Sequence, residues 1–126
     1  MAETLCIWDR RKTMVIEIND EFAAALELME TGRNVFITGK AGTGKSTLLD
    51  YFRKSTKKKT AVLAPTGVAA VNISGQTIHS FFGFGPDITP EKVAVVRGEK
   101  RDGYRAIETI VIDEISMVRA DLLDCV

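Results

Sequence analysis

The sequence has few of the features that mark secreted, membrane-spanning or strongly charged proteins. Its two cysteines, Cys6 and Cys125, stand near opposite ends without the spacing of a metal site, which favours free thiols in a reducing compartment. Basic and acidic residues both number 17, so the formal net charge is zero. Overall charge therefore gives no sign of a nucleic-acid partner, and any such surface must be a local patch.

Two further absences concern the membrane. No apolar run reaches the roughly 18 residues that a membrane span requires, and the N-terminus lacks the basic-then-apolar order of a signal peptide. The 126 residues, 45% hydrophobic and 27% charged, have an ordinary globular composition and suffice for one domain with a modest core. We expect an intracellular protein of the cytoplasm or nucleoid of a bacterial-type cell, with no membrane partner.

A glycine-rich segment carries the clearest chemical signal. It reads Gly39-Lys40-Ala41-Gly42-Thr43-Gly44-Lys45-Ser46-Thr47 and fits G-x-x-x-x-G-K-[ST], a phosphate-binding loop. An apolar run at 35–38 predicts a buried strand before the loop, and residues 46–52 predict a helix after it.

The chemistry explains why these residue types stand at this spacing. Glycines let backbone N–H groups approach a triphosphate closely, and the following helix N-terminus favours anions. Lys45 is predicted to reach the β- and γ-phosphates, and the Ser46 hydroxyl to bind Mg²⁺. The alternative is a glycine-rich turn before an ordinary helix.

Two adjacent acids, Asp113 and Glu114, follow the apolar run at 109–112. The run predicts a buried strand that delivers both carboxylates at its C-terminal end. Asp113 is expected to hold Mg²⁺ together with Ser46, and Glu114 to act as general base on the attacking water. The alternative is that the pair caps the next helix. Ser116 stands where a GTPase switch would place glycine, so ATP hydrolysis fits better.

The order of predicted elements indicates an α/β fold, in which a parallel sheet has flanking helices and binds ligands at the C-terminal ends of its strands. We expect helices from Asn19-Asp20 to 31–32, at 66–73 and at 91–96, a strand at 60–64, a surface loop at 97–103 and a helical stripe over 115–126. Residues 1–18 are either a short strand pair or an extension that packs elsewhere.

Four segments together resemble the first motifs of the Pif-type DNA helicases, a group of superfamily 1 related to RecD. They are residues 39–47, 64–70, 75–82 and 111–117. The resemblance implies a P-loop NTPase fold of the RecA-like kind, with residues 1–18 as an N-terminal extension and 19–126 as the first part of a motor domain. It implies ATP-driven 5′-to-3′ movement on single-stranded DNA and unwinding at duplex junctions, with Mg²⁺ as cofactor and Lys45 and Glu114 as catalytic residues.

The two middle segments are implied to contact the DNA strand. The candidate residues are Pro65, Thr66, Gly67, Thr77, His79, Ser80 and Phe81. Hydroxyls and backbone N–H groups there suit phosphates, and an aromatic ring or the imidazole suits a base. The alternative is structural: Ile78, Phe81 and Phe82 as plain core, and His79 as a buried histidine with satisfied hydrogen bonds.

The sequence departs from the family pattern in two ways. No glutamine precedes Asn34, where the family reads adenine with one, and Asn19 or Glu21 occupy that neighbourhood, which leaves the preference for ATP open. The later motifs are also missing, including a sensor strand expected between the loop strand and the acid-pair strand. We therefore expect the 126 residues alone to bind nucleotide weakly at best and not to unwind DNA. Another P-loop ATPase, or a non-catalytic nucleotide- or DNA-binding remnant, are the alternatives.

Overall fold

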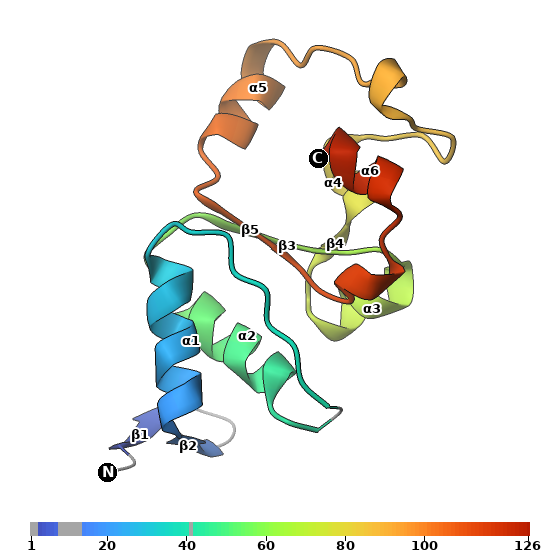
Figure 1. The fold of residues 1–126 in the computed structure, drawn as a ribbon. Helices are drawn as coiled ribbons and strands as arrows, with labels where there is room; N and C mark the ends of the chain where they lie inside the picture. Colours follow the sequence, from blue (N-terminus) through green and yellow to red (C-terminus); the bar gives the residue numbers. More distant parts are fainter. Residues whose placement is uncertain (1–2, 8–13, 41) are drawn as a thin grey trace. The chain divides into compact units, whose positions relative to one another are not determined.

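The computed structural model describes residues 3–7, 14–40 and 42–126. The chain divides into a first unit, Met1–Thr56, and a second unit, Lys57–Val126 (Figure 1). Each unit is taken by itself below.

The first unit opens with an antiparallel pair of strands. β1 (Glu3–Ile7) pairs with β2 (Met14–Ile18), so that Glu3 lies opposite Ile18. This confirms the strand-pair alternative for the start of the chain. The connecting residues 8–13, with Trp8 and the charged run after it, lie outside the described residues.

Two helices complete the first unit. α1 (Asp20–Glu30) begins as predicted, because the Asn19 Oδ1 accepts a hydrogen bond from the Phe22 N–H at 2.8 Å. α2 (Lys45–Ser55) follows the glycine-rich loop, as expected, and buries Leu48 and Phe52. The rings of Phe22 and Tyr51 meet edge to face at 5.9 Å, which joins α1 to α2.

The strand predicted at 35–38 is wrong. Residues 34–40 have no regular secondary structure, and Phe36 is 75% exposed. A strand is defined by its ladder of hydrogen bonds with a neighbour, and none of the strands in the described part of the chain pairs with this segment. An apolar run without such a neighbour forms no strand.

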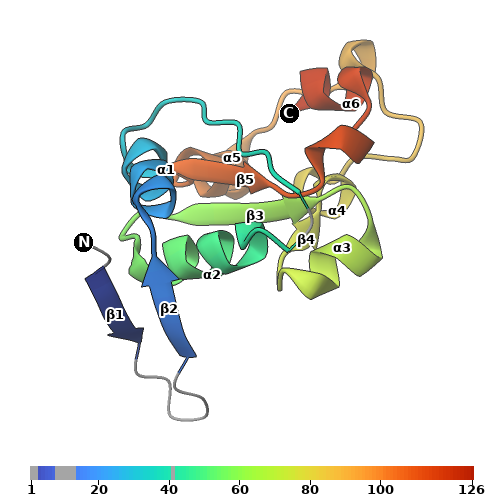
Figure 2. The ribbon, with the colours of Figure 1, turned by 60° about the horizontal axis from the view of Figure 1, so that its bottom comes forward.

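The second unit contains a parallel sheet of three strands, which confirms the predicted fold class. The order is β4 (Gln76–Thr77), β3 (Thr60–Ala64), β5 (Thr109–Ile112). Figure 2 shows β3 running beside β5, with Leu63 paired to Ile112 and Ala64 to Thr77. The apolar run of β3 fits its central place, because residues 61–64 are all buried.

Short helices connect and cover these strands. They are α3 (Gly67–Asn72), α4 (Ile78–Phe82), α5 (Gly98–Arg105) and α6 (Ala120–Cys125), with 3₁₀ turns η1 (Pro90–Lys92) and η2 (Ile115–Met117). Ala61, Leu63, Ile78 and Leu122 form the core cluster of this unit. In the described residues no helix is both long and apolar enough to cross a membrane.

Several predictions for the second half of the chain need correction. The helix expected at 91–96 is only the turn η1, while the loop expected at 97–103 is the helix α5. Glu99, Lys100 and Arg101 are good helix formers and outweigh Gly103. The stripe over 115–126 is divided into η2 and α6, because Val118 and Arg119 are extended.

Candidate nucleotide and DNA site

The glycine-rich loop closes upon its own backbone. The Thr43 hydroxyl donates to the Lys40 carbonyl at 2.8 Å, and the Thr43 N–H points to the same oxygen at 3.3 Å. Gly42 and Gly44 have φ of 79° and 89°, a region that other residues enter only at a cost. A Cβ on Gly39 would stand 2.8 Å from the Thr43 Oγ1. These glycines are therefore required by the loop geometry, while Ala41 lies outside the described residues.

The Lys45 ammonium lies at this loop. Its Nζ donates to the Gly39 carbonyl at 2.6 Å and to the Lys40 carbonyl at 2.9 Å, although the residue is exposed. Ser46 is exposed in the first turn of α2, and Thr47 is half-buried. A cation held by neutral carbonyls can exchange them for phosphate oxygens, which bind it more strongly because they are charged.

Asn19 precedes the glycine-rich loop in the sequence and is the N-cap residue of α1. Its side-chain oxygen already accepts the cap hydrogen bond from Phe22. The cap uses one of the two lone pairs of this oxygen and neither amide hydrogen, so the Asn19 side chain still offers both acceptor and donor capacity.

Three chain segments leave the sheet of the second unit at one edge. Because β3, β4 and β5 are parallel, their C-terminal ends point the same way: β3 leads into Pro65, β4 ends at Thr77, and β5 leads into Asp113. The Asp113 N–H donates to the Leu63 carbonyl at 2.9 Å, which extends the ladder by one residue beyond β5. Neighbouring strands are about 4.8 Å apart. Asp113 and Thr77 therefore flank the end of β3 from opposite sides.

The acid pair has an uncommon backbone. Glu114 has φ 52° and ψ 42°, the left-handed conformation that favours glycine. Glu114 is at the N-cap position of η2, but its side chain makes no cap hydrogen bond. The observation disfavours the alternative that Glu114 simply caps the next helix. Its carboxylate is exposed, and that of Asp113 is half-buried.

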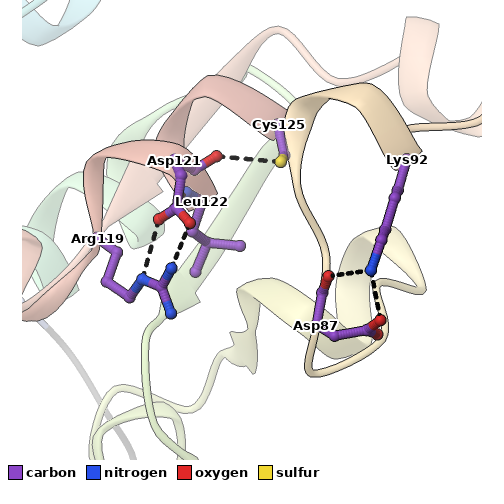
Figure 3. Close-up of polar contacts among 6 residues, drawn as sticks. All are labelled: Asp87, Lys92, Arg119, Asp121, Leu122 and Cys125. Carbon is purple, nitrogen blue, oxygen red and sulfur yellow. Dashed lines mark hydrogen bonds and ion pairs between the residues drawn. The ribbon is translucent and has the colours of Figure 1, made fainter.

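The polar contacts of α6, which follows the acid pair in the sequence, join neighbouring residues of the same segment (Figure 3). Leu122 of α6 is buried in the core cluster. The Arg119 guanidinium forms an ion pair with Asp121, which also accepts from the Leu122 N–H at 3.0 Å. The Cys125 thiol, a free cysteine, donates to the Asp121 carbonyl at 3.1 Å. Asp113 and Glu114 are thus held between β5 and a packed helix.

Two threonines at the sheet edge start the helices of the candidate DNA segments. The Thr66 Oγ1 accepts from the Ala69 N–H at 3.2 Å, and the Thr77 Oγ1 accepts from the Ser80 N–H at 3.1 Å. A capping hydroxyl still has its own hydrogen to donate. Thr66 and Gly67 are exposed, whereas Pro65 and Thr77 are half-buried.

The remaining candidates lie on α4. Ser80 is exposed, and His79 and Phe81 are half-buried. Ile78 is fully buried, so the structural alternative holds for that residue. The rings of Phe81 and Phe82 meet edge to face at 4.9 Å and pack against the core cluster. The Phe81 ring thus packs against the core cluster on one part and is exposed to solvent on another.

Sequence reasoning missed two residues that contact this segment. Tyr104 and Lys100 of α5 hydrogen-bond the carbonyls of Phe81 and Phe82. Lys100 lies in the stretch 97–103 that was predicted as a loop, and Tyr104 follows it directly. The helix-forming run with an aromatic residue near its end was the signal for both. In the part of the chain that the structure describes, no cluster of three or more histidine, cysteine or acidic side chains could hold a metal.

Comparisons with known proteins agree with this arrangement. A family model described as PIF1-like helicase matches residues 15–126. The chain is 44% identical over 116 residues to the ATP-dependent DNA helicase Pif1 of Bdellovibrio bacteriovorus, covering 86% of this chain and 26% of that protein. It is 42% identical over 112 residues to the human ATP-dependent DNA helicase PIF1, covering 86% and 18%.

Solved structures give the same result. Bacteroides sp. Pif1 in complex with ADP-AlF4 matches with a TM-score of 0.78 and 40% identity over 87% of this chain and 26% of that one. Bacteroides Pif1 bound to ssDNA matches with a TM-score of 0.75 and 42% identity, with the same coverage. The chain thus spans about a quarter or less of the length of these relatives.

The matched region contains the closed glycine loop, the anchored acid pair and the two threonine-capped segments between them in the sequence. The family model covers nearly the whole chain, and both named relatives are more than 40% identical to it over the matched residues. The chain therefore belongs to the PIF1-like helicase family.

Proposed function

We propose that this chain is the nucleotide-binding and first DNA-binding part of an ATP-dependent DNA helicase that moves 5′ to 3′ on single-stranded DNA. One observation carries the proposal beyond family membership. The acid pair follows β5, and the two candidate DNA segments begin at the ends of β3 and β4, all at the C-terminal edge of the same parallel sheet. The proposed hydrolytic acids and the proposed DNA contacts thus share one sheet edge, and coupling of hydrolysis to DNA movement requires such proximity.

The nucleotide roles follow the chemistry of the side chains. The loop from Gly39 to Thr47 holds the triphosphate through backbone N–H groups, and Lys45 stabilises the charge that develops on the γ-phosphate. Ser46 and Asp113 are oxygen ligands of the kind that Mg²⁺ prefers, and the bound ion would neutralise phosphate charge. Glu114 accepts a proton from the attacking water. ATP is the proposed substrate.

The DNA roles rest on groups that remain available to donate. The hydroxyls of Thr66, Thr77 and Ser80, with the backbone at Pro65-Gly67, hold phosphates without reading sequence. His79, helped by Phe81, lies against a base or sugar. The proposed partners are single-stranded DNA and the junction where it meets a duplex.

Strand separation tests this proposal with the complete gene product. Two labelled duplexes, one with a 5′ single-stranded tail and one with a 3′ tail, are incubated with ATP and Mg²⁺. We expect separation of the 5′-tailed duplex alone. Glu114→Gln should bind ATP but lower hydrolysis about 10²- to 10⁴-fold, the usual contribution of a general base, and stop separation.

The other outcomes identify the alternatives. Hydrolysis of ATP without separation of either duplex would indicate a P-loop ATPase of another kind. Absence of both activities in the wild-type protein would indicate a non-catalytic binding protein, and either result overturns the proposal.

A further inference from the structure

Helix α5 contacts the end of α4 through two side chains. The Tyr104 hydroxyl donates to the Phe81 carbonyl at 2.9 Å, and the Lys100 ammonium donates to the Phe82 carbonyl at 3.2 Å. The last carbonyls of a helix have no partner within the helix. These two side chains therefore satisfy backbone groups that α4 leaves open, and they do so from a segment 18 or more residues further along the chain.

Ring contacts between α5 and α4 accompany these hydrogen bonds and restrict the rotation of α4. The Tyr104 ring lies 5.5 Å from each of the Phe81 and Phe82 rings, and the Lys100 Nζ stands 5.7 Å from the centre of the Tyr104 ring. Turning α4 about its axis would separate the rings and also break both carbonyl contacts. The contact thus fixes the rotation of α4 as well as its position.

The other end of α4 is fixed independently. The Thr77 hydroxyl caps the helix through the Ser80 N–H, and the Ile78 side chain is fully buried in the core cluster. Gly83 ends the helix with φ 72°, and a Cβ there would stand 2.8 Å from the Lys100 Nζ. His79 and Ser80 lie between these two fixed ends. The contacts at both ends of α4 therefore determine the orientation of these two residues.

We propose that Tyr104 and Lys100 are positioning residues that hold α4 in the orientation in which His79 and Ser80 meet the DNA strand. This inference rests on the proposed function, because it assumes that α4 contacts DNA. Neither residue itself touches DNA in this account. Their loss should weaken DNA binding through α4, without changing the number of ionic contacts with phosphates.

The test uses the complete gene product and single-stranded DNA labelled with a fluorophore. Tyr104→Phe keeps the ring but removes the hydrogen bond to Phe81, and should raise the Kd for DNA about two- to tenfold, the range for a lost hydrogen bond. Tyr51→Phe is the matched control, because these are the two tyrosines of the chain, and should leave the Kd unchanged. The rate of ATP hydrolysis at saturating DNA should stay close to that of the wild type, because Tyr104→Phe changes only the DNA concentration at which the protein becomes saturated.

Salt dependence separates positioning from direct contact for Lys100. Lys100→Met should raise the Kd while leaving the slope of log Kd against log salt unchanged. A direct phosphate contact would instead lower the slope by about one, and that result would overturn the role given to Lys100. Arg101→Met removes the same charge from the same helix and should change neither quantity.

A double-mutant cycle distinguishes failure of this inference from failure of the proposed function. If Tyr104 acts through α4, its effect should be much smaller in a Ser80→Ala, His79→Ala background, so the effects are not additive. Full additivity, or a normal Kd for Tyr104→Phe, would overturn the positioning role alone. If the α4 variant itself binds DNA like the wild type, the proposed DNA contact of α4 is wrong.

Discussion

Among single residues, Glu114 combines the proposed catalytic role with backbone strain. Outside glycine, the described residues with positive φ are Ser74 and Glu114. The left-handed region costs a residue with a Cβ on the order of 1 kcal/mol. This strain turns the chain sharply after β5, directly where the acid pair leaves the sheet.

Substitution of Glu114 separates strain from chemistry. Glu114→Gly relieves the strain and Glu114→Ala keeps it, while both remove the carboxylate. We expect the glycine variant to be more stable than the alanine variant by about 1 kcal/mol, with hydrolysis lost in both. Chemical denaturation of the two proteins measures the difference. Equal stability would show that φ at this residue is not strained.

A second residue-scale prediction concerns pH. The hydrogen bond from Arg119 holds the pKa of Asp121 below its usual value, partly opposed by desolvation. Because the folded-state pKa is lowered, the stabilisation is present above the unfolded carboxyl pKa of about 3.9 and is lost as pH falls through the folded value. Asp121→Asn should therefore lower the Tm at pH 7. The difference in Tm between the wild-type protein and this variant should become smaller below about pH 4.

Thermal melts across this pH range check the sign. Asp124→Asn, on the same helix α6, is the matched control and should show no comparable narrowing. A difference that stays constant, or widens, as pH falls would contradict the account of the ion pair between Arg119 and Asp121.

At the scale of the elements, Gly75 in the turn between α3 and β4 has less room for a side chain than the other glycines of the described residues. A Cβ on Gly75 would lie 2.4 Å from the Val62 carbonyl oxygen, a backbone atom of the central strand β3. Since the backbone of β3 cannot move aside without loss of sheet pairing, we expect Gly75→Ala to destabilise the protein by about 1 to 3 kcal/mol. Urea titration measures the change.

Gly103→Ala is the control for that substitution, and it also tests α5. Gly103 lies inside α5, and a Cβ there meets nothing within 4 Å. Alanine should therefore stabilise the protein by about 0.5 to 1 kcal/mol. A loss of stability would indicate that α5 is not a helix at Gly103, in line with the loop that the sequence alone predicted at 97–103.

Elements were predictable from sequence where local chemistry decides them. Asn19 starts α1, the apolar run 60–64 is central in the sheet, and the helix α2 follows the glycine loop. The segment 35–38 was not predictable, because a strand depends on a partner that pattern cannot supply. The same holds for α5, whose Tyr104 packs on rings 20 residues or more earlier in the chain.

The candidate site shows the same division. The loop lysine and the acid pair could be named from residue type and spacing. Thr66 and Thr77 could be named from the family resemblance, but their capping hydrogen bonds are seen only in the structure. The strained φ of Glu114 and the contacts of Lys100 with α4 depend on tertiary packing, and no spacing rule indicates them.

At the scale of the whole molecule, the central claim is that nucleotide hydrolysis and DNA binding are linked. The second unit places Asp113 on one side of the end of β3 and Thr77 on the other. The chain covers 26% of its Bdellovibrio relative and 18% of the human one. The link must therefore be tested on the complete gene product.

Steady-state ATP hydrolysis, with and without single-stranded DNA, is the most direct measurement. With Mg²⁺ present, we predict that DNA strongly accelerates hydrolysis by the wild-type protein, and that Lys45→Ala and Glu114→Gln hydrolyse little ATP whether DNA is present or not. Equal rates for the wild-type protein with and without saturating DNA would contradict the account.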